Sequence, residues 1–218
     1  MKFHTKPTFT LSCLALLTAA IGCGDPATDL QVERLPEVQP NLPTVPTLPP
    51  PPHPTTYPDS SYSIYGLRAR LSTTIDNSQV VTGYVVDIYT PPDCEPRSAG
   101  CRISAPHFWV ADTRIPESEL QDKRGEMLMI VGYAENQQQI DDAIEEHERG
   151  REPEVDPVTG RLVETGMYPI PVDLVIGNKV KLRGRFSRMS SAGFNNSEGL
   201  LDYHGHDTLE AVTPPEES

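Results

Sequence analysis

The sequence predicts a mainly β domain of five strands, with one helix between the third strand and the fourth. Runs of β-branched and aromatic residues recur at strand length through the second half of the chain. One stretch alone, 137–150, has the periodicity of an amphipathic helix. An apolar N-terminal segment and a proline-rich stretch come first, and neither fits a sheet. We therefore expect one folded domain over 61–212 and a loose tail over 213–218.

The strands follow from local patterns, taken in chain order. A possible edge strand or lead-in over 62–72 and a turn at 76–78 precede the first long strand. The five strands are expected over 79–90, 107–113, 126–134, 179–189 and 199–209. Gly83 lies inside the first of them, where a bulge or sharp bend is expected.

The expected helix over 137–150 places Ile140, Ala143 and Ile144 on one face, and Gly150 follows at its end. The polar residues 151–168 are expected to form an exposed insertion. A turn at 176–178 then leads into the fourth strand.

Residues 1–22 have the pattern of a secretory signal peptide. Lys2 and Lys6 precede an apolar run, Leu11 to Ile21, that is too short to span a bilayer. The segment Ala20-Ile21-Gly22-Cys23 resembles the lipobox of bacterial lipoproteins. The resemblance implies that Cys23 is the lipidated first residue of the mature protein, whose acyl chains (palmitate among them) anchor it in a membrane without crossing it. The alternative is an ordinary cleaved signal that leaves Cys23 as a thiol.

This resemblance implies a place in the bacterial cell envelope. Gly24 is not the Asp that retains lipoproteins in the inner membrane of enteric bacteria, so we expect the outer membrane, on its periplasmic or its surface face. Residues 23–60 follow the lipobox, and Gly24 to Ser60 holds eleven of the 23 prolines. Proline fixes φ and removes backbone donors, which predicts an extended, disordered stalk with a reach on the order of 100 Å. The alternative is a proline motif that binds a recognition domain.

Charge and cysteines restrict the function further. The net charge is −13, and cleavage after residue 22 would remove Lys2 and Lys6 and no acid, leaving −15. Such a charge repels nucleic acid. With Cys13 in the signal and Cys23 lipidated, Cys94 and Cys101 are expected to form a disulfide, as is usual after export. A metal site that uses both with His107 is the alternative, although their spacing fits no standard zinc pattern.

Several local patterns resemble those of OB-folds. They are VVTGYVVDIY in the first strand, FWVAD in the second, IGNKVKLRGRF at the fourth and GFNNSEGLLDY before the fifth. The order of five strands with a helix after the third also matches. The resemblance implies a small closed barrel that binds nucleic acid, sugars or protein.

The candidate binding face lies on the second and third strands. If Phe108 and Val110 point into the barrel, alternation turns Trp109 outward, and the same argument turns Met129 and Tyr133 outward on the next strand. If these side chains are exposed, they form the kind of surface that binds a partner. The other interpretation, which fits strands that are apolar on both faces better, is that the helix or the insertion covers them as a second small core.

The fourth strand carries a basic stripe, which we define as Lys179, Lys181, Arg183 and Arg185. With aromatic neighbours, a stripe of this kind over 179–188 would suit single-stranded nucleic acid. The alternative is pairing with the acidic residues of 141–156, which fits the net charge better.

Asp202, His204 and His206 on the last strand have a spacing that a metal-dependent hydrolase could use, but a solvent-facing polar edge is the simpler interpretation. No catalytic motif, cofactor motif or metal pattern stands out elsewhere. We therefore expect a non-catalytic binding or adaptor domain, without a cofactor, for an envelope protein or glycan partner.

Overall fold

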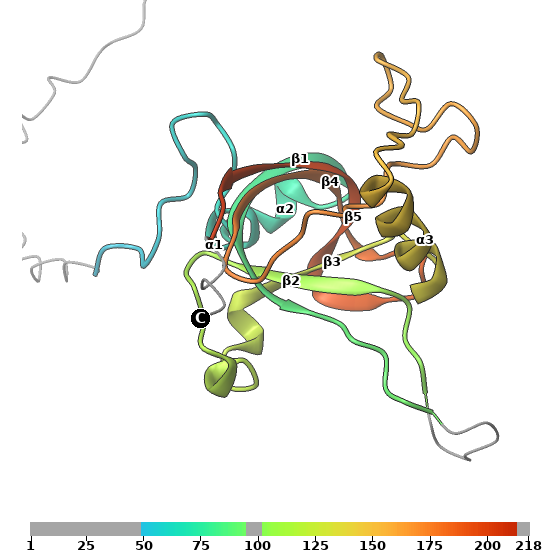
Figure 1. Cartoon of the computed structure of the whole chain (residues 1–218). Helices are drawn as coiled ribbons and strands as arrows, with labels where there is room; N and C mark the ends of the chain where they lie inside the picture. The colour runs from blue at the N-terminus through green and yellow to red at the C-terminus, as the bar shows by residue number, and fades with distance from the viewer. Residues whose placement is uncertain (1–48, 95–101, 213–218) are drawn as a thin grey trace, which may run out of the picture. The chain divides into compact units, whose positions relative to one another are not determined.

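The computed structural model describes residues 49–94 and 102–212 (Figure 1). The predicted signal peptide, Cys23, the first part of the proline-rich stretch and the tail over 213–218 lie outside these residues. Five strands make up one sheet, and all five were predicted: β1 (Asn77–Ile88), β2 (His107–Ala111), β3 (Met127–Val131), β4 (Lys179–Met189) and β5 (Asn195–Glu210). The protein is therefore mainly β in its described part.

The sheet is mixed and closes on itself. Neighbouring strands pair in the order β1-β2-β3-β5-β4, and β4 also pairs with β1. Every pairing is antiparallel except that of β3 with β5, where Ile130 lies opposite Leu201 and Val131 opposite Asp202. Strand β5 begins earlier than predicted, because its ladder with β4 extends to the pair of Met189 with Asn195.

The main core fills the inside of this closed sheet. Val85, Phe108, Leu128 and Leu182 are all fully buried there. On β4 the predicted alternation is confirmed, since the apolar side chains at 180, 182 and 186 are buried between basic ones that reach the surface. Alternation of this kind is how a strand with one buried face separates core from solvent.

Two short helices, α1 (Ile64–Ala69) and α2 (Leu71–Thr74), occupy the segment where an edge strand or lead-in was expected. The edge-strand prediction is wrong because the backbone at this point is capped for a helix. The Ser63 hydroxyl accepts a hydrogen bond from Gly66 N at 2.8 Å. The carboxylate of Asp112 accepts hydrogen bonds from the N–H groups of Ile64 and Tyr65, each at 2.8 Å, and Asp112 is far away in the sequence.

Gly83 has a different role from the one predicted. The register between β1 and β2 shifts between Val85 and Asp87, so the bulge lies beyond the glycine. A Cβ atom at Gly83 would come within 2.8 Å of Ile64 Cδ1 and 2.9 Å of the Ala111 carbonyl oxygen. The glycine therefore allows α1 and β2 to pack closely against β1.

The predicted helix between β3 and β4 is confirmed as α3 (Gln137–Glu148), with the Asn136 side chain accepting from Gln139 N at 3.1 Å. In Figure 1, α3 lies at one end of the closed sheet and α1 at the other. No residue of α3 is fully buried; Ile140 packs against the main core, whereas Ile144 remains 36 % exposed. The helix thus contributes a narrow apolar contact and a broad polar surface.

The end of the proline-rich stretch is bound to the domain. The Ser63 N–H donates to the Thr55 carbonyl at 3.3 Å, and the Ser63 hydroxyl donates to the Pro54 carbonyl at 2.5 Å. Thr56 also forms an antiparallel bridge with Tyr62. The domain was predicted to begin at residue 61, but these hydrogen bonds extend it to Pro54.

Candidate binding surface

The outer face of β2 and β3 is a second, smaller core. Trp109 points outward as predicted but is only 5 % exposed, and it packs with Val86, Ile115 and Met127. The cover comes from the segment between β2 and β3, which holds the 3-10 helices η1 (Glu117–Glu119) and η2 (Arg124–Glu126). The guanidinium of Arg124 lies 4.1 Å from the centre of the Trp109 ring.

This arrangement corrects the prediction of an exposed face in part. Trp109 is covered, and Met129 is half-buried at the edge of the same cluster. The cover is neither the helix nor the insertion, the two segments that the sequence suggested. It is local in the chain, since residues 112–126 fold back on the strands that they connect.

Tyr133 was predicted to point outward, and this is wrong. Its ring lies inside the main core, 5.6 Å from Phe108 and 6.0 Å from Tyr203 between ring centres. Gly132 has a φ of 80°, a left-handed conformation that ends the strand and resets the alternation of side chains. Burial raises the pKa of the Tyr133 hydroxyl well above its ordinary value.

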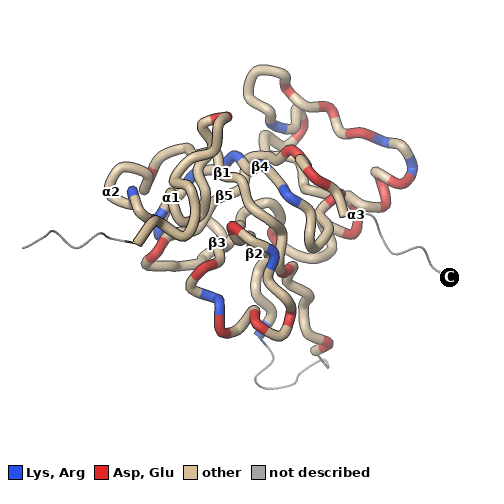
Figure 2. Tube along the Cα trace, turned by 90° about the vertical axis from the view of Figure 1, so that its left-hand side faces the viewer, with Lys and Arg blue, Asp and Glu red and all other residues tan. Residues whose placement is uncertain are grey.

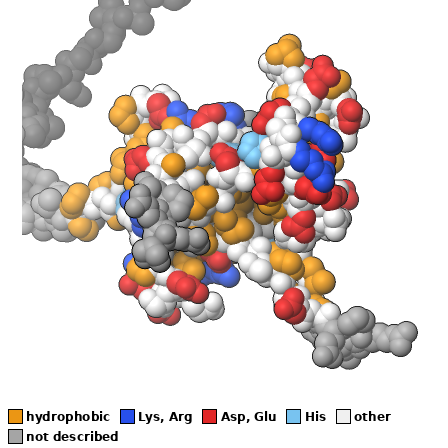
Figure 3. Space-filling view, viewed as in Figure 1, with side chains coloured by type: hydrophobic (Ala, Val, Ile, Leu, Met, Phe, Trp, Pro, Cys, Tyr) orange, Lys and Arg blue, Asp and Glu red, His pale blue; other side chains and the backbone are white. Residues whose placement is uncertain are grey.

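An aromatic cluster is present next to the covered tryptophan. We define it as Tyr89, His107 and Phe194, which come from the end of β1, the start of β2 and the hairpin between β4 and β5. The rings of Tyr89 and His107 stack at 4.7 Å, and Phe194 meets His107 edge-on at 5.1 Å. All three side chains are partly exposed. In Figure 3, hydrophobic side chains gather near the middle of the face that carries β2 in Figure 1.

The imidazole of His107 is held in one orientation. Its Nδ1 atom lies 2.9 Å from the Ala105 carbonyl oxygen, and burial lowers the pKa of His107. The ring is therefore neutral at neutral pH and carries its proton on Nδ1, where the carbonyl accepts it. Its Nε2 atom is left as a hydrogen-bond acceptor between two aromatic rings.

A small pocket of about 150 Å³ adjoins Tyr89. Its walls come from the loop before β2, including Ile103 and Ser104, and from the start of α3, including Asn136. The Tyr89 hydroxyl accepts a hydrogen bond from Ser104 N at 3.0 Å, which orders this loop beside the ring. The cluster and the pocket together offer flat apolar rings next to uncharged polar groups. Sequence reasoning missed Tyr89 and Phe194, because nothing local shows that two loop residues so far apart meet at His107.

The basic stripe lies on one face of β4, as predicted, but each of its four cations has an acidic neighbour. The pairs are Lys179 with Glu210 at 3.1 Å, Lys181 with Asp59, Arg183 with Asp207 at 2.5 Å and Arg185 with Asp76 at 4.0 Å. Two of these acids lie on β5 or at its end, and the other two precede β1. None belongs to the acidic stretch 141–156 that the sequence suggested.

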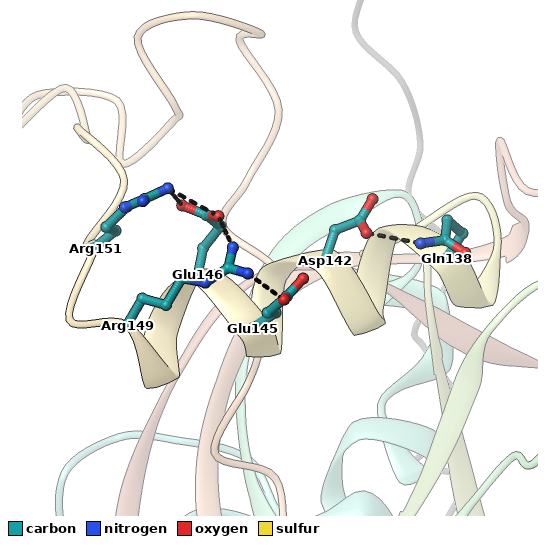
Figure 4. A network of polar contacts seen from close by, with 6 residues as sticks. All are labelled: Gln138, Asp142, Glu145, Glu146, Arg149 and Arg151. Carbon is teal, nitrogen blue, oxygen red and sulfur yellow. Dashed lines mark hydrogen bonds and ion pairs between the residues drawn. The ribbon is translucent and has the colours of Figure 1, made fainter.

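That acidic stretch instead pairs within itself. Arg149 and Arg151 each lie 2.9 Å from the carboxylate of Glu146, and Arg149 is also paired with Glu145 (Figure 4). Gln138 donates to Asp142 at 2.7 Å one turn away. Acidic residues are spread over α3, the insertion and several loops rather than on a single face (Figure 2).

Asp202, His204 and His206 do not converge on one point. Asp202 is half-buried beside Ser187, and burial raises the pKa of its carboxyl group. His206 lies 2.8 Å from the Tyr203 hydroxyl through Nδ1, while His204 stacks on Tyr168 at 4.3 Å. Within residues 49–94 and 102–212, no three His, Cys, Asp or Glu side chains are grouped so that they could hold a metal ion. The predicted partner of Cys94, Cys101, lies outside the described residues, so that disulfide stays a prediction.

Comparison with known proteins adds no assignment. No family model, no curated protein and no solved structure matches the chain. Among the helices that the structure describes, none has both the length and the hydrophobicity needed to span a bilayer.

Proposed function

We propose that the protein is a lipid-anchored bacterial envelope lipoprotein whose folded part is an OB-fold-like barrel that binds a protein or glycan partner without catalysis. The strand order, the parallel pairing of β3 with β5 and the helix between β3 and β4 support this barrel type. The aromatic cluster is the observation that carries the binding role. It joins the loop after β1, the start of β2 and the β4–β5 hairpin, where barrels of this kind place their ligands.

The chemistry of this surface favours an uncharged ligand group. The cluster presents flat rings, the acceptor Nε2 of His107 and nearby amide and hydroxyl groups. Sugar rings and the apolar or amide groups of a polypeptide both suit such a surface. The guanidinium of Arg124, which lies over the neighbouring Trp109, is already engaged, since it is also 3.7 Å from Asp87.

Single-stranded nucleic acid is the second candidate, because the basic stripe is real. Its four cations are paired with acids, and the whole chain is strongly negative, so few of its positive charges can neutralise phosphates. Weak binding of a single-stranded oligonucleotide that disappears with moderate salt is the expected result. Tight binding that depends on Arg183 and Arg185 would favour this second function. The metal-dependent hydrolase suggested for the last strand gains no support from the structure, because Asp202, His204 and His206 do not converge on one point; bound-metal analysis of the purified protein would test it.

The binding role is tested by crosslinking and pull-down from intact cells that express the tagged protein. The informative variant is Tyr89→Ala with Phe194→Ala, since both side chains are partly exposed and can be removed without opening the core. A matched control is Tyr65→Ala, which removes a half-buried tyrosine of α1 outside the cluster. A partner retained by the control and lost in the double variant is expected. Equal capture by all three proteins would contradict the assignment of this surface.

The anchor is tested separately. Cys23→Ala should move the protein from the membrane fraction to the soluble fraction of the cell envelope and remove incorporated palmitate. If the variant remains lipidated and membrane-bound, Cys23 is not the anchor.

A further inference from the structure

A second pocket, of about 540 Å³, lies between β5 and the segment over 155–173, which includes part of the insertion. Its volume is within the range of small-molecule sites. It shares no lining residue with the aromatic cluster. One wall is formed by Arg183, Tyr203, His204 and His206, and the other by a strap that we define as residues 168–173.

A chain of polar contacts links this strap to the strand. The Tyr203 hydroxyl lies 2.8 Å from His206 Nδ1, and His206 Nε2 lies 3.0 Å from Asp173 Oδ1. Burial raises the pKa of Tyr203, so its hydroxyl keeps its proton and can donate to His206. The His206 side chain is only 8 % exposed. The Tyr203 hydroxyl is satisfied by His206, whereas the contact of His206 Nε2 with Asp173 has the distance of an ion pair without the geometry of a hydrogen bond, so this buried nitrogen keeps hydrogen-bonding capacity beside the pocket.

His204 is positioned differently. Arg183 pairs with Gly205 and Gly184 with Tyr203, which leaves His204 as the extra residue of a bulge in β5. Bulges of this kind redirect a side chain, and here the ring of His204 stacks on Tyr168 of the strap. The other face of Tyr168 is covered by Arg161, whose guanidinium lies 4.4 Å from the ring centre.

The hydrogen-bonding capacity of His204 is unfilled. Its ring nitrogens make no hydrogen bond with any residue that the structure describes. Burial and the charge of Arg161 lower the pKa of His204, so the imidazole is neutral at neutral pH and offers one donor and one acceptor.

The strap itself has spare polar groups. Pro169 and Pro171 have no N–H, and the backbone N–H groups of Ile170 and Val172 donate to no other part of the described chain. Half-buried backbone groups without a protein partner are normally satisfied by water or a ligand.

The charged groups of the pocket are already compensated. Arg183 is paired with Asp207, and Asp173 lies against His206 and accepts weakly from the Thr208 hydroxyl at 3.4 Å. The unfilled groups are therefore neutral donors and acceptors beside apolar prolines. A charged ligand would lose its hydration here without gaining an opposite charge from a lining side chain, since Arg161 lies over the Tyr168 ring and outside the lining.

We infer that this pocket binds a neutral, hydroxyl-bearing ligand of the size of one or two sugar rings, with His204 as its main side-chain hydrogen-bond partner. The inference does not rest on the role proposed for the aromatic cluster. It assigns the strap and the bulge of β5 to a second binding site on the same domain.

The test uses the full chain labelled with ¹⁵N at histidine, with glucose and N-acetylglucosamine as probes. Addition of at least one sugar should shift the imidazole nitrogens of His204 and leave those of His107 unchanged. His204→Phe keeps a ring to stack on Tyr168 and removes the hydrogen bonds. Binding to this variant, followed by the strap residues in amide spectra, should weaken about tenfold, as expected for the loss of one good hydrogen bond.

Two results would overturn the inference. One is the absence of any His204 shift with either sugar at high millimolar concentration. The other is stronger binding of glucosamine or glucuronate than of glucose, because both carry a charge that this pocket should reject. Tyr89→Ala with Phe194→Ala should leave the His204 shifts intact, so failure of the aromatic cluster and failure of this pocket remain distinguishable.

Discussion

Gly66→Ala is expected to destabilise the domain, although the same change on an open helix would stabilise it. Gly66 lies within α1, where alanine is ordinarily favoured by about 1 kcal/mol. Here a Cβ atom would lie 1.8 Å from the Thr55 carbonyl oxygen and 2.5 Å from its carbon. These are backbone atoms, so the end of the proline-rich stretch must move away from the helix.

The expected cost follows from the contacts that this movement breaks. Two hydrogen bonds are lost, from the N–H and the hydroxyl of Ser63 to Thr55 and Pro54, at about 1 kcal/mol each. The Ser63 side chain is fully buried, so its hydroxyl proton loses its acceptor, at about 1–2 kcal/mol more. After the gain in helix propensity is subtracted, the free energy of unfolding should fall by about 2–3 kcal/mol.

Urea denaturation followed by the fluorescence of Trp109, the one tryptophan of the chain, measures this change. Gly125→Ala is the matched control, because a Cβ atom there would meet nothing within 4 Å. Amide hydrogen exchange at Tyr57 should also accelerate in Gly66→Ala. A variant as stable as the wild type or more stable, with unchanged exchange at Tyr57, would refute the argument from close packing.

Three other results are expected. Leu182→Ala should lower the free energy of unfolding by about 2–5 kcal/mol in urea denaturation, because this side chain is fully buried, and a near-zero effect would mean that β4 presents its other face to the core. Asp202→Asn should stabilise the domain at neutral pH. Burial raises the pKa of Asp202 in the folded state above its unfolded-state value of about 4. The contribution of Asp202 to stability is therefore fully present below the unfolded-state pKa, and it is lost as the pH rises through the folded-state pKa. The advantage of the variant should therefore shrink towards acidic pH, and a constant difference across pH would contradict the assignment. Mass spectrometry of unreduced, digested protein should show Cys94 joined to Cys101, whereas two free thiols would argue against the exported, oxidised state.

The strands could be predicted because their patterns are local. Alternation along residues 179–189 is enough to separate Leu182 from its basic neighbours, and α3 has its cap and periodicity within its own sequence. The edge strand predicted near residues 64–74 was wrong because the start of the helix there depends on Asp112, which no local pattern connects to Ile64. The orientation predicted for Tyr133 was wrong because Gly132, a left-handed residue between the end of β3 and Tyr133, resets the alternation of side chains.

The candidate site was less predictable than the fold. Tyr89, His107 and Phe194 become a cluster only through the order in which the strands close, and the sequence does not show that order. A covered Trp109 was weighed, but the covering segment was missed, since the helix and the insertion were considered and residues 112–126 were not. The basic stripe was found, but its acidic partners come from segments on both sides of it in the chain, which only the paired strands bring near.

The attachment of Pro54 and Thr55 to Ser63 has a mechanical consequence. A pull on the chain from its N-terminal side acts first on these hydrogen bonds and on the bridge between Thr56 and Tyr62. The hydrogen bonds between β1 and its neighbouring strands come under load only after these contacts have opened. These contacts would therefore yield under tension before the closed sheet does, releasing a few residues on the N-terminal side while the folded part stays whole.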